Sequence, residues 1–419
     1  MTAEEQLSAV VSADPAKSIR SGLLRRLILL ISPHIIHGRL TICLPRGEKI
    51  TVRGSGERKT QLDEARVDVI RSRAFFRAIA GGAMGLARSY VDGDWETPDL
   101  SAVLNLAAIN QEDFRRRRGN SPLVNALNRV RYFRHRRRKN SLSGSQRNIA
   151  QHYDLGNNFY NLWLDRSMNY SAGLFLGGAN DLAMAQEAKC RRLAEALNIR
   201  PGMRVLEIGC GWGGFAEMVA RDFDCHVTAI TISKAQYEYA CERIARNGLS
   251  DMVDVRFQDY RDLNGQYDRI ASIEMFEAVG EKYWPTFMKK ISDCLSRDGL
   301  IGLQVITIEE GRYERYRRSA DFIQHYIFPG GMLPSEKVLQ ATLSAADLEL
   351  KNRFAFGASY AETLFCWRNR FEEAWEEISS LGFDAPFRRV WRYYLAYCEA
   401  GFRSGSLDVG QYVIAKTSR

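Results

Sequence analysis

An acid followed by a glycine-rich turn is the feature of this sequence that most directly suggests chemistry. The apolar run 205–208 contains Glu207 and leads into Gly209, Gly211 and Gly213. Glycines let the backbone approach a ligand where a Cβ atom would block it, and a helix expected near Phe215 directs free N–H groups at the turn. Dinucleotide-binding folds use a similar loop, but Glu207 would repel their pyrophosphate and suits a cation. The pattern therefore predicts a site for a cationic nucleoside cofactor.

Polar residues also end the next two apolar runs. Many nucleoside-binding folds carry an acid for the ribose hydroxyls after the second strand, and here Thr231 and Gln236 are predicted to take that role. Asp259 and Tyr260 follow the third run, where they are expected to hydrogen-bond and stack on an adenine. The alternative is that Asp259 is only a loop residue.

The elements that must position these residues alternate between strands and helices, a pattern typical of a parallel sheet covered by helices. We expect strands at 203–208, 225–231, 253–257, 267–273 and 299–306, with helices near 212–222, 233–247 and 280–296 between them. Such connections place a ligand outside the carboxyl ends of the strands. The sequence therefore predicts an α/β fold with its site at that edge.

Further motifs, in their order along the chain, resemble those of the cyclopropane-fatty-acyl-phospholipid synthase family, which includes the mycolic acid cyclopropane synthases. Besides the glycine loop they are 89–95 (SYVDGDW), 152–157 (HYDLGN), 168–171 (MNYS), 258–262 (QDYRD), 275–280 (MFEAVG) and 326–331 (YIFPGG). The resemblance spans roughly residues 75–415. An acid before this glycine loop is also the usual first motif of S-adenosyl-L-methionine (SAM) methyltransferases.

The resemblance implies a class I SAM methyltransferase with a Rossmann-like sheet, helical insertions and a small, mainly helical N-terminal domain. The expected boundaries are 1–114 for a lipid- or partner-contacting domain, 115–145 for a basic linker and 146–419 for the SAM-dependent methyltransferase domain. SAM is expected to contact Glu207, Gly209, Gly211, Thr231, Gln236, Asp259 and Tyr260, while Tyr153, Tyr170 and Ser171 close over its methionine end. The implied activity is transfer of a one-carbon unit to the double bond of unsaturated acyl chains in membrane phospholipids.

The resemblance also implies how a proton leaves the substrate. In cyclopropane synthases the glutamate matching Glu277 helps to hold a bicarbonate ion that takes the proton, and the tyrosine matching Tyr360 bonds the same ion. Both residues are therefore expected to be catalytic. Glu274 precedes Glu277 by three residues, so a helical turn could bring the two carboxylates together and raise one pKa.

The sequence departs from the family pattern at this anion site. Ala172 and Ile306 stand where the family usually has a cysteine and a histidine, and Ala278 follows Glu277 where many relatives have histidine. The cysteine acts mainly through its backbone, but Ile306 cannot replace an imidazole donor. Bicarbonate is therefore expected to be held weakly, or Glu277 removes the proton itself, or the cation is resolved differently. Loss of a proton from another carbon would give a fatty-acyl methyltransferase that makes methylated or methylene-bearing chains without ring closure.

Composition is consistent with an enzyme that works at a surface from the cytoplasm. The chain has 419 residues, 45% of them hydrophobic, enough for two or three domains with substantial cores. No apolar stretch is long enough to span a bilayer. The run 27–31 follows two arginines and lacks a cleavage site, which argues against a signal peptide. The eight scattered cysteines show no metal-binding spacing, so no metal is expected and they are interpreted as thiols in a reducing compartment.

Charge is concentrated in one segment. Residues 115–139 contain eleven Arg or Lys and no acid, and without them the chain has 48 basic against 50 acidic residues. We expect this segment to contact anionic lipids of a phospholipid bilayer, at about 1 kcal/mol per engaged charge, which would place the enzyme peripherally on the inner face of the membrane. A solvated linker is the alternative. Nucleic acid is not expected as a partner, because only Tyr132 and Phe133 could stack on bases.

A second candidate for membrane contact lies before the basic segment, at residues 19–31. Ile19, Leu23, Leu24, Leu27, Leu30 and Ile31 recur at helical spacing. Such a helix could lie among lipid headgroups, but it more often packs on its own domain or on a partner subunit, which leaves a homodimer open.

Two other classes of function compete with this reading. A small-molecule or nucleic-acid methyltransferase would keep the SAM loop but would have no need for the N-terminal domain and the aromatic insert at about 307–400. A catalytically silent lipid-binding protein would tolerate loss of Glu277 and the glycine loop, and both are intact.

Overall fold

The computed structural model describes residues 35–56, 64–111, 155–176 and 181–417. These residues form two compact units, described separately below. The larger unit comprises the described residues from 155 to Gly382 together with those from Gly405 onward. The smaller unit comprises the described residues up to 111 together with Phe383–Ser404.

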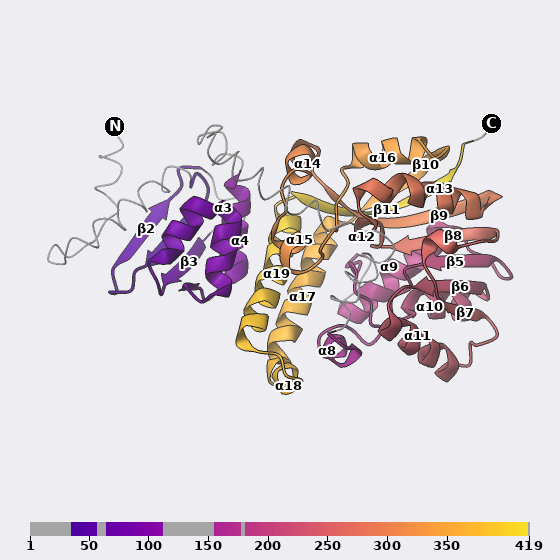
Figure 1. Ribbon diagram of the computed structural model, residues 1–419, viewed down its shortest axis with the longest axis horizontal. Helices are drawn as coiled ribbons and strands as arrows, with labels where there is room; N and C mark the ends of the chain where they lie inside the picture. Colours follow the sequence, from indigo (N-terminus) through magenta and orange to yellow (C-terminus); the bar gives the residue numbers. More distant parts are fainter. Residues whose placement is uncertain (1–34, 57–63, 112–154, 177–180, 418–419) are drawn as a thin grey trace. The chain divides into compact units, whose positions relative to one another are not determined.

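The larger unit is built on a seven-stranded sheet in the order β10-β11-β9-β8-β5-β6-β7. Figure 1 shows these strands side by side. Their bounds are β5 Arg204–Ile208, β6 His226–Thr231, β7 Val253–Phe257, β8 Tyr267–Ile273, β9 Leu295–Ile308, β10 Leu348–Ala355 and β11 Leu407–Lys416. The strands β5 to β9 pair in parallel, whereas β11 pairs antiparallel with both β9 and β10.

The strand order reverses at β5. The chain runs outward through β6 and β7, then returns to place β8 on the other side of β5. At such a switch point the loops that follow the two central strands diverge and leave a crevice for a ligand. Glu207 lies near the carboxyl end of β5, and Glu274 and Glu277 follow the carboxyl end of β8, so the fold brings the two predicted acid sites to one edge.

Helices cover both faces of this sheet. On β5, Leu206 and Ile208 belong to one apolar cluster, which also includes side chains of α13 (Trp284–Cys294) and α16 (Glu336–Ser344). Val205 belongs to the other cluster, with side chains of α9 (Leu182–Ala196), α10 (Gly214–Phe223) and α11 (Lys234–Arg246). This alternation follows from the two-residue period of a strand. It explains why the five parallel strands and three of the helices could be predicted from apolar runs, and those predictions are confirmed.

The larger unit also contains shorter helices and 3₁₀ turns. They are α8 Asn157–Asn161, α12 Phe276–Val279, α14 Glu310–Tyr316, α15 Phe322–Tyr326 and α18 Trp375–Ser380, with 3₁₀ turns η2 Tyr260–Asp262 and η3 Glu281–Tyr283. The longer helix α17 spans Gly357–Glu373. Asp321 begins α15 with a capping box, in which its side chain accepts from the Gln324 N–H and the Gln324 side chain accepts from the Asp321 N–H.

The smaller unit contains a sheet that the sequence did not predict. Its strands are β1 Arg39–Cys43, β2 Lys49–Arg53, β3 Glu64–Val69 and β4 Trp95–Glu96, in the order β2-β1-β3-β4. The helices α3 Arg73–Val91, α4 Leu100–Ile109 and α19 Ala385–Arg403 complete the unit. Helical residues outnumber strand residues, but the expectation of a mainly helical domain missed this sheet because its strands are short and interrupted by charged residues.

Helix α19 also departs from the predicted domain boundaries. The sequence placed residues 146–419 in one methyltransferase domain, whereas α19 packs against α3 and α4 of the smaller unit. The Ser101 hydroxyl donates to the buried Glu399 carboxylate at 2.9 Å. The Arg389 guanidinium donates to the Tyr90 carbonyl at 2.6 Å and lies 4.2 Å from the Tyr90 ring centroid. These contacts join residues about 300 apart, so no local pattern could reveal them.

Three predictions from the sequence concern residues outside the described ranges: the helix expected at 19–31, the basic segment at 115–139 and the site residue Tyr153. Across the ranges that the structure does describe, no helix is both long and apolar enough to cross a bilayer.

Candidate active site

The glycine loop follows β5 as predicted, and its conformation requires glycine. Gly209, Gly211 and Gly213 have φ angles of +81°, +54° and +82°, in the left-handed region. A Cβ atom on Gly209 would also lie 2.8 Å from Cγ of Met275. The N–H groups of Gly209 and Cys210 donate to the Ile230 carbonyl at 3.0 and 2.9 Å, which fixes the loop to β6.

Glu207 lies buried at the base of this loop, only 3% exposed. Burial raises the pKa of its carboxyl to about 8, although nearby Lys189 and a hydrogen bond from the Ala216 N–H lower it. Its Oε2 has no hydrogen-bond partner among the described residues. A buried acceptor beside a glycine loop is suited to a hydroxyl donor or a cationic group of a ligand.

The residues predicted to contact adenosine follow strands β6 and β7, and their surroundings in the structure differ. The Thr231 hydroxyl donates to the Gln236 side-chain oxygen at 2.9 Å, so these two buried residues form one polar unit after β6. Asp259 accepts from the Arg261 guanidinium at 2.9 and 3.0 Å, so its carboxylate is already paired on both oxygens. Tyr260 is part of the apolar core and contacts Phe287 edge-on at 5.3 Å. Burial raises the pKa of Tyr260 to about 12, and its packing leaves little ring surface for stacking on an adenine.

The two motifs upstream of the sheet contact the cofactor loop and an aromatic cluster. Asn157, the last residue of the 152–157 motif, accepts from the Trp212 indole N–H at 2.8 Å. Tyr170 contacts the rings of Tyr160, Trp163 and Trp367 at 5.3 to 5.5 Å between centroids. The structure therefore surrounds Tyr170 with aromatic faces beside the glycine loop. Such faces can stabilise a cation without reacting with it.

Ser171 leads to a buried lysine that the sequence analysis did not identify. The Lys189 ammonium is fully buried and donates to the Ser171 hydroxyl at 2.6 Å. Lys189 also lies close enough to Glu207 and Glu274 to lower the pKa of each carboxyl. The available signal was a lysine at helical spacing among mostly apolar residues of α9, on the face that also carries Gln186. Lys189 places one positive charge between the two acid sites.

Glu274 and Glu277 form the second acid site, after β8. Glu277 Oε1 accepts from the Ile306 N–H at 2.5 Å, and its Oε2 is buried with no partner in the described part of the chain. Burial, and to a lesser extent the nearby Glu274 carboxylate, raises the pKa of Glu277 to about 8. The expected proximity of the two acids is therefore present. A helical turn is not its cause, because α12 begins only at Phe276 and Glu274 has a φ of +50°.

Tyr360 lies at this site but bonds the other acid. Its hydroxyl donates to Glu274 Oε2 at 2.7 Å, and its ring contacts Trp367 at 6.1 Å. Glu274 Oε1 accepts from the Ala172 N–H and from the Gln304 side-chain amide, both at 2.8 Å. Gln304 had a sequence signal, as a polar residue inside an apolar strand. Its partner Gln411, at 3.1 Å, had none because β11 was not predicted.

The residues fit SAM but do not fit bicarbonate. For SAM, the left-handed glycine loop offers backbone without side chains beside Glu207, and Glu207 supplies an acceptor with no other partner in the described ranges. For bicarbonate, the resemblance implied donors at Tyr360 and the backbone of residue 172. Both of these donate to Glu274, and the Ile306 N–H donates to Glu277. These three donors therefore bond the carboxylates of Glu274 and Glu277, and they are not available to a bicarbonate ion.

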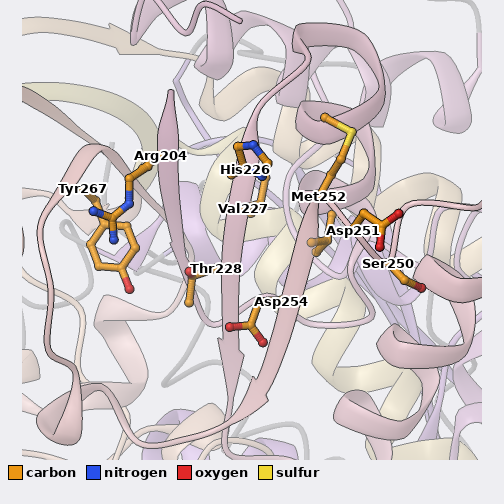
Figure 2. A pocket seen from close by; sticks show the side chains of 10 residues that line it. Arg204, His226, Val227, Thr228, Ser250, Asp251, Met252, Asp254 and Tyr267 are labelled. Carbon is orange, nitrogen blue, oxygen red and sulfur yellow. The ribbon is translucent and has the colours of Figure 1, made fainter. Parts of the chain in front are cut away.

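A hollow at the opposite edge of the sheet is separate from this site. Figure 2 shows it lined by Arg204, His226 and Tyr267, the first residues of β5, β6 and β8, together with Asp251 and Asp254. It therefore lies at the amino ends of the strands, away from the glycine loop.

The seven-stranded sheet, the acid before the glycine loop and the site at the carboxyl edge define a class I SAM-dependent methyltransferase. Comparison with known proteins agrees with this class. The model of the mycolic acid cyclopropane synthetase family matches residues 140–412, so the chain belongs to that family.

Curated relatives of two kinds are equally similar to this chain. It is 36% identical over 347 residues to the tuberculostearic acid methyltransferase UfaA1 of Mycobacterium tuberculosis, covering 80% of this chain and 79% of the relative. It is also 36% identical over 351 residues to the cyclopropane-fatty-acyl-phospholipid synthase of Escherichia coli, covering 82% and 85%. Identity alone therefore does not distinguish methylation from ring closure.

Solved structures share the fold over about two thirds of this chain. The mycolic acid cyclopropane synthase CmaA1, complexed with SAH and CTAB, has a TM-score of 0.61 and 29% identity, covering 65% of this chain and 98% of that one. The cyclopropane synthase MmaA2 from Mycobacterium tuberculosis gives the same TM-score at 28% identity and the same coverage.

Proposed function

We propose that this enzyme transfers the methyl carbon of SAM to the double bond of unsaturated acyl chains in membrane phospholipids. One observation carries the proposal: a buried carboxylate pair, Glu274 and Glu277, is linked through Tyr360 to an aromatic cluster at the edge that holds the glycine loop. Methylation of an alkene requires this combination, because it creates a carbocation that must be shielded from water and then lose a proton.

The residues around the cofactor would divide its binding between them. SAM supplies a methyl group made electrophilic by its sulfonium charge. Glu207 would accept from the cofactor's hydroxyls or amine, and the Thr231–Gln236 unit and Asp259 would contact the adenosine. Tyr170 and Ser171 would contact the methionine end of SAM. Tyr153 was predicted to contact the same end, and that contact stays a prediction. Tyr260 would support the adenine pocket from the core, because its ring already packs on Phe287.

The aromatic cluster and the acids would act on the acyl chain. An alkene is a weak nucleophile, so holding it in line with the methyl group supplies much of the rate. The partly exposed ring of Tyr170 would stabilise the cation that follows, with the buried Trp163 and Trp367 packed against it. Glu277 would accept the proton at Oε2, its buried carboxyl oxygen with no partner in the described chain.

A second candidate function is methylation without ring closure. Position 306 carries an apolar side chain, and its N–H is used by Glu277. If the proton leaves a chain carbon instead of the added methyl carbon, the product keeps a double bond. The chain is 36% identical both to a tuberculostearic acid methyltransferase and to a cyclopropane synthase, and this equal identity supports the alternative.

We propose further that the enzyme acts as a peripheral protein on anionic bilayers. The basic segment at 115–139 supports this from the sequence. In the smaller unit, Ile70 and Phe76 are each 52% exposed, next to Arg71, Arg73 and Arg77. The three guanidinium groups all pair with the fully buried Asp94 at 2.7 to 3.3 Å, so they are held together. Exposed apolar side chains beside clustered arginines are suited to acyl chains and lipid phosphates.

Lipid analysis tests the proposed reaction directly. The full-length protein would be expressed with trideuteromethyl-labelled methionine in bacteria that lack a cyclopropane synthase, and their phospholipid acyl chains analysed by mass and alkene content. Ring closure retains two deuterons and consumes the alkene. A methylated alkene retains all three deuterons, and a methylene branch retains two with an alkene present. Glu277→Gln, which should bind SAM but form no product, is the control, and unlabelled acyl chains with the parent protein would refute the proposal.

A further inference from the structure

The carboxylate of Glu274 is held as a bound anion would be. It accepts three hydrogen bonds, from the Ala172 N–H, the Gln304 amide and the Tyr360 hydroxyl, at 2.7 to 2.8 Å. Two of these donors are the groups that the family resemblance assigns to bicarbonate. Since a carboxylate and bicarbonate both present oxygen acceptors on a planar carbon, one can take the place of the other.

The backbone and the surrounding network fix this carboxylate in place. Glu274 has a φ of +50°, an unfavourable conformation for a residue other than glycine, and such strain persists only where its surroundings enforce it. Its N–H donates to the Gln304 carbonyl at 2.8 Å. The Gln304 side chain is itself held by Gln411, whose oxygen accepts from Arg192 at 2.7 Å. The carboxylate is therefore positioned from both β9 and β11.

We propose that Glu274 is a built-in anion that replaces bicarbonate, so that the Glu274–Glu277 pair removes the substrate proton without an external anion. The inference rests on the proposed function, because it concerns the fate of the proton in that reaction. It gives Glu274 a role that the sequence analysis did not assign, and it accounts for the apolar residue at position 306.

The step balances without another reactant. The alkene π electrons form a bond to the methyl carbon, the carbon–sulfur bond breaks, and its electrons remain on sulfur as a neutral thioether. The second alkene carbon is left as a cation. A C–H bond then breaks, its electrons close the ring or form a new double bond, and Glu277 Oε2, which must be ionised before this step, takes the proton. The carboxylate of Glu274 stabilises the cation and stays ionised through its three hydrogen bonds.

The electrostatics of the pair are consistent with this division. Burial raises the pKa of Glu274, but its hydrogen bonds and Lys189 oppose that effect. Glu277 has fewer donors and the Glu274 charge beside it, and its pKa is raised to about 8. Two such close acids titrate as a pair. Because Glu277 can take the substrate proton only after it has lost its own, the rate should rise as pH rises toward about 8.

Binding of labelled bicarbonate tests the inference without any turnover. Carbon-13 bicarbonate would be titrated by NMR into the full-length protein carrying S-adenosylhomocysteine. The wild-type protein should not bind it. Glu274→Gly should bind it at millimolar concentration, because glycine tolerates the positive φ and exposes the three donors. Glu274→Gln, which keeps the shape without the charge, should not bind, and Glu310→Gln is the matched control at an exposed glutamate.

Rates in carbon dioxide-free buffer give the second measurement. The wild-type rate on phospholipid vesicles should be unaffected by bicarbonate. Glu274→Gly should lose at least about tenfold, since charge-assisted hydrogen bonds are lost, and should recover with bicarbonate or formate. Glu274→Gln should lose a similar factor without recovery.

A wild-type protein that binds or requires bicarbonate would overturn the inference. A Glu274→Gly variant that folds and keeps the parent rate in carbon dioxide-free buffer would do the same. If the wild-type protein methylates no phospholipid, the proposed function fails, while the bicarbonate titration still decides whether Glu274 occupies the anion site.

Discussion

Replacing Glu277 by glutamine should abolish turnover and leave SAM binding intact, and it should also change how stability depends on pH. The glutamine side chain can still accept from the Ile306 N–H, so the local structure is retained. It cannot take a proton, so the reaction stops after SAM has bound. It also removes an acid whose burial disfavours ionisation.

The size of the stability effect follows from the pKa of Glu277. That pKa rises from 4.5 to about 8 on folding. Between these values the folded state holds a proton that the unfolded state has released, so the stability contributed by this group is fully present below pH 4.5 and is lost as pH rises through about 8. Each pH unit is worth about 1.4 kcal/mol, which gives roughly 5 kcal/mol over the whole interval as an upper bound.

Thermal unfolding of the wild-type protein and Glu277→Gln between pH 5 and pH 9 measures this difference. The variant should gain relative to the wild type as pH rises, by about 1.5 °C in midpoint temperature per pH unit up to about pH 8, and by no more above it. Glu310→Gln should run parallel to the wild type at every pH. Parallel curves for Glu277→Gln as well would refute the buried, proton-binding state assigned to Glu277, and full activity of this variant would show that another group is the base.

Three further predictions concern the cofactor loop, the membrane and the smaller unit. Gly209→Val should abolish SAM binding in calorimetry, because it combines a strained φ with a contact to Met275, whereas Gly311→Ala, at an open helical position, should bind normally. Phe76→Ser should weaken co-sedimentation with anionic vesicles at high salt, where the electrostatic contribution of the arginines and of segment 115–139 is screened. Equal binding by that variant would exclude the Phe76 side chain as a membrane contact. Ser101→Ala should destabilise the protein by about 1–3 kcal/mol in urea, because it removes a donor from the buried Glu399 carboxylate, and an unchanged midpoint would count against this contact.

The fold could be predicted where local sequence pattern and tertiary position coincide. The strands β5 to β9 are apolar runs that end in polar residues, so their bounds were nearly those observed. The strand β10 carries charged and polar residues, and both β10 and β11 pair antiparallel with strands distant in the sequence. Neither they nor the smaller sheet was predicted. Helix α19 looked like part of the larger domain because sequence order does not indicate which unit a helix packs in.

The sequence by itself determined the cofactor loop, the class of enzyme and the acids after β8, because glycine spacing and apolar runs are local properties. Only the tertiary structure decided which groups those acids contact. The Ala172 N–H lies 102 residues from Glu274 along the chain, and the Tyr360 hydroxyl lies 86 residues away. Sheet register and the left-handed backbone at Glu274 bring them together, and because these hydrogen bonds join distant segments, the replacement of an external anion by a side chain could be inferred only from the folded protein.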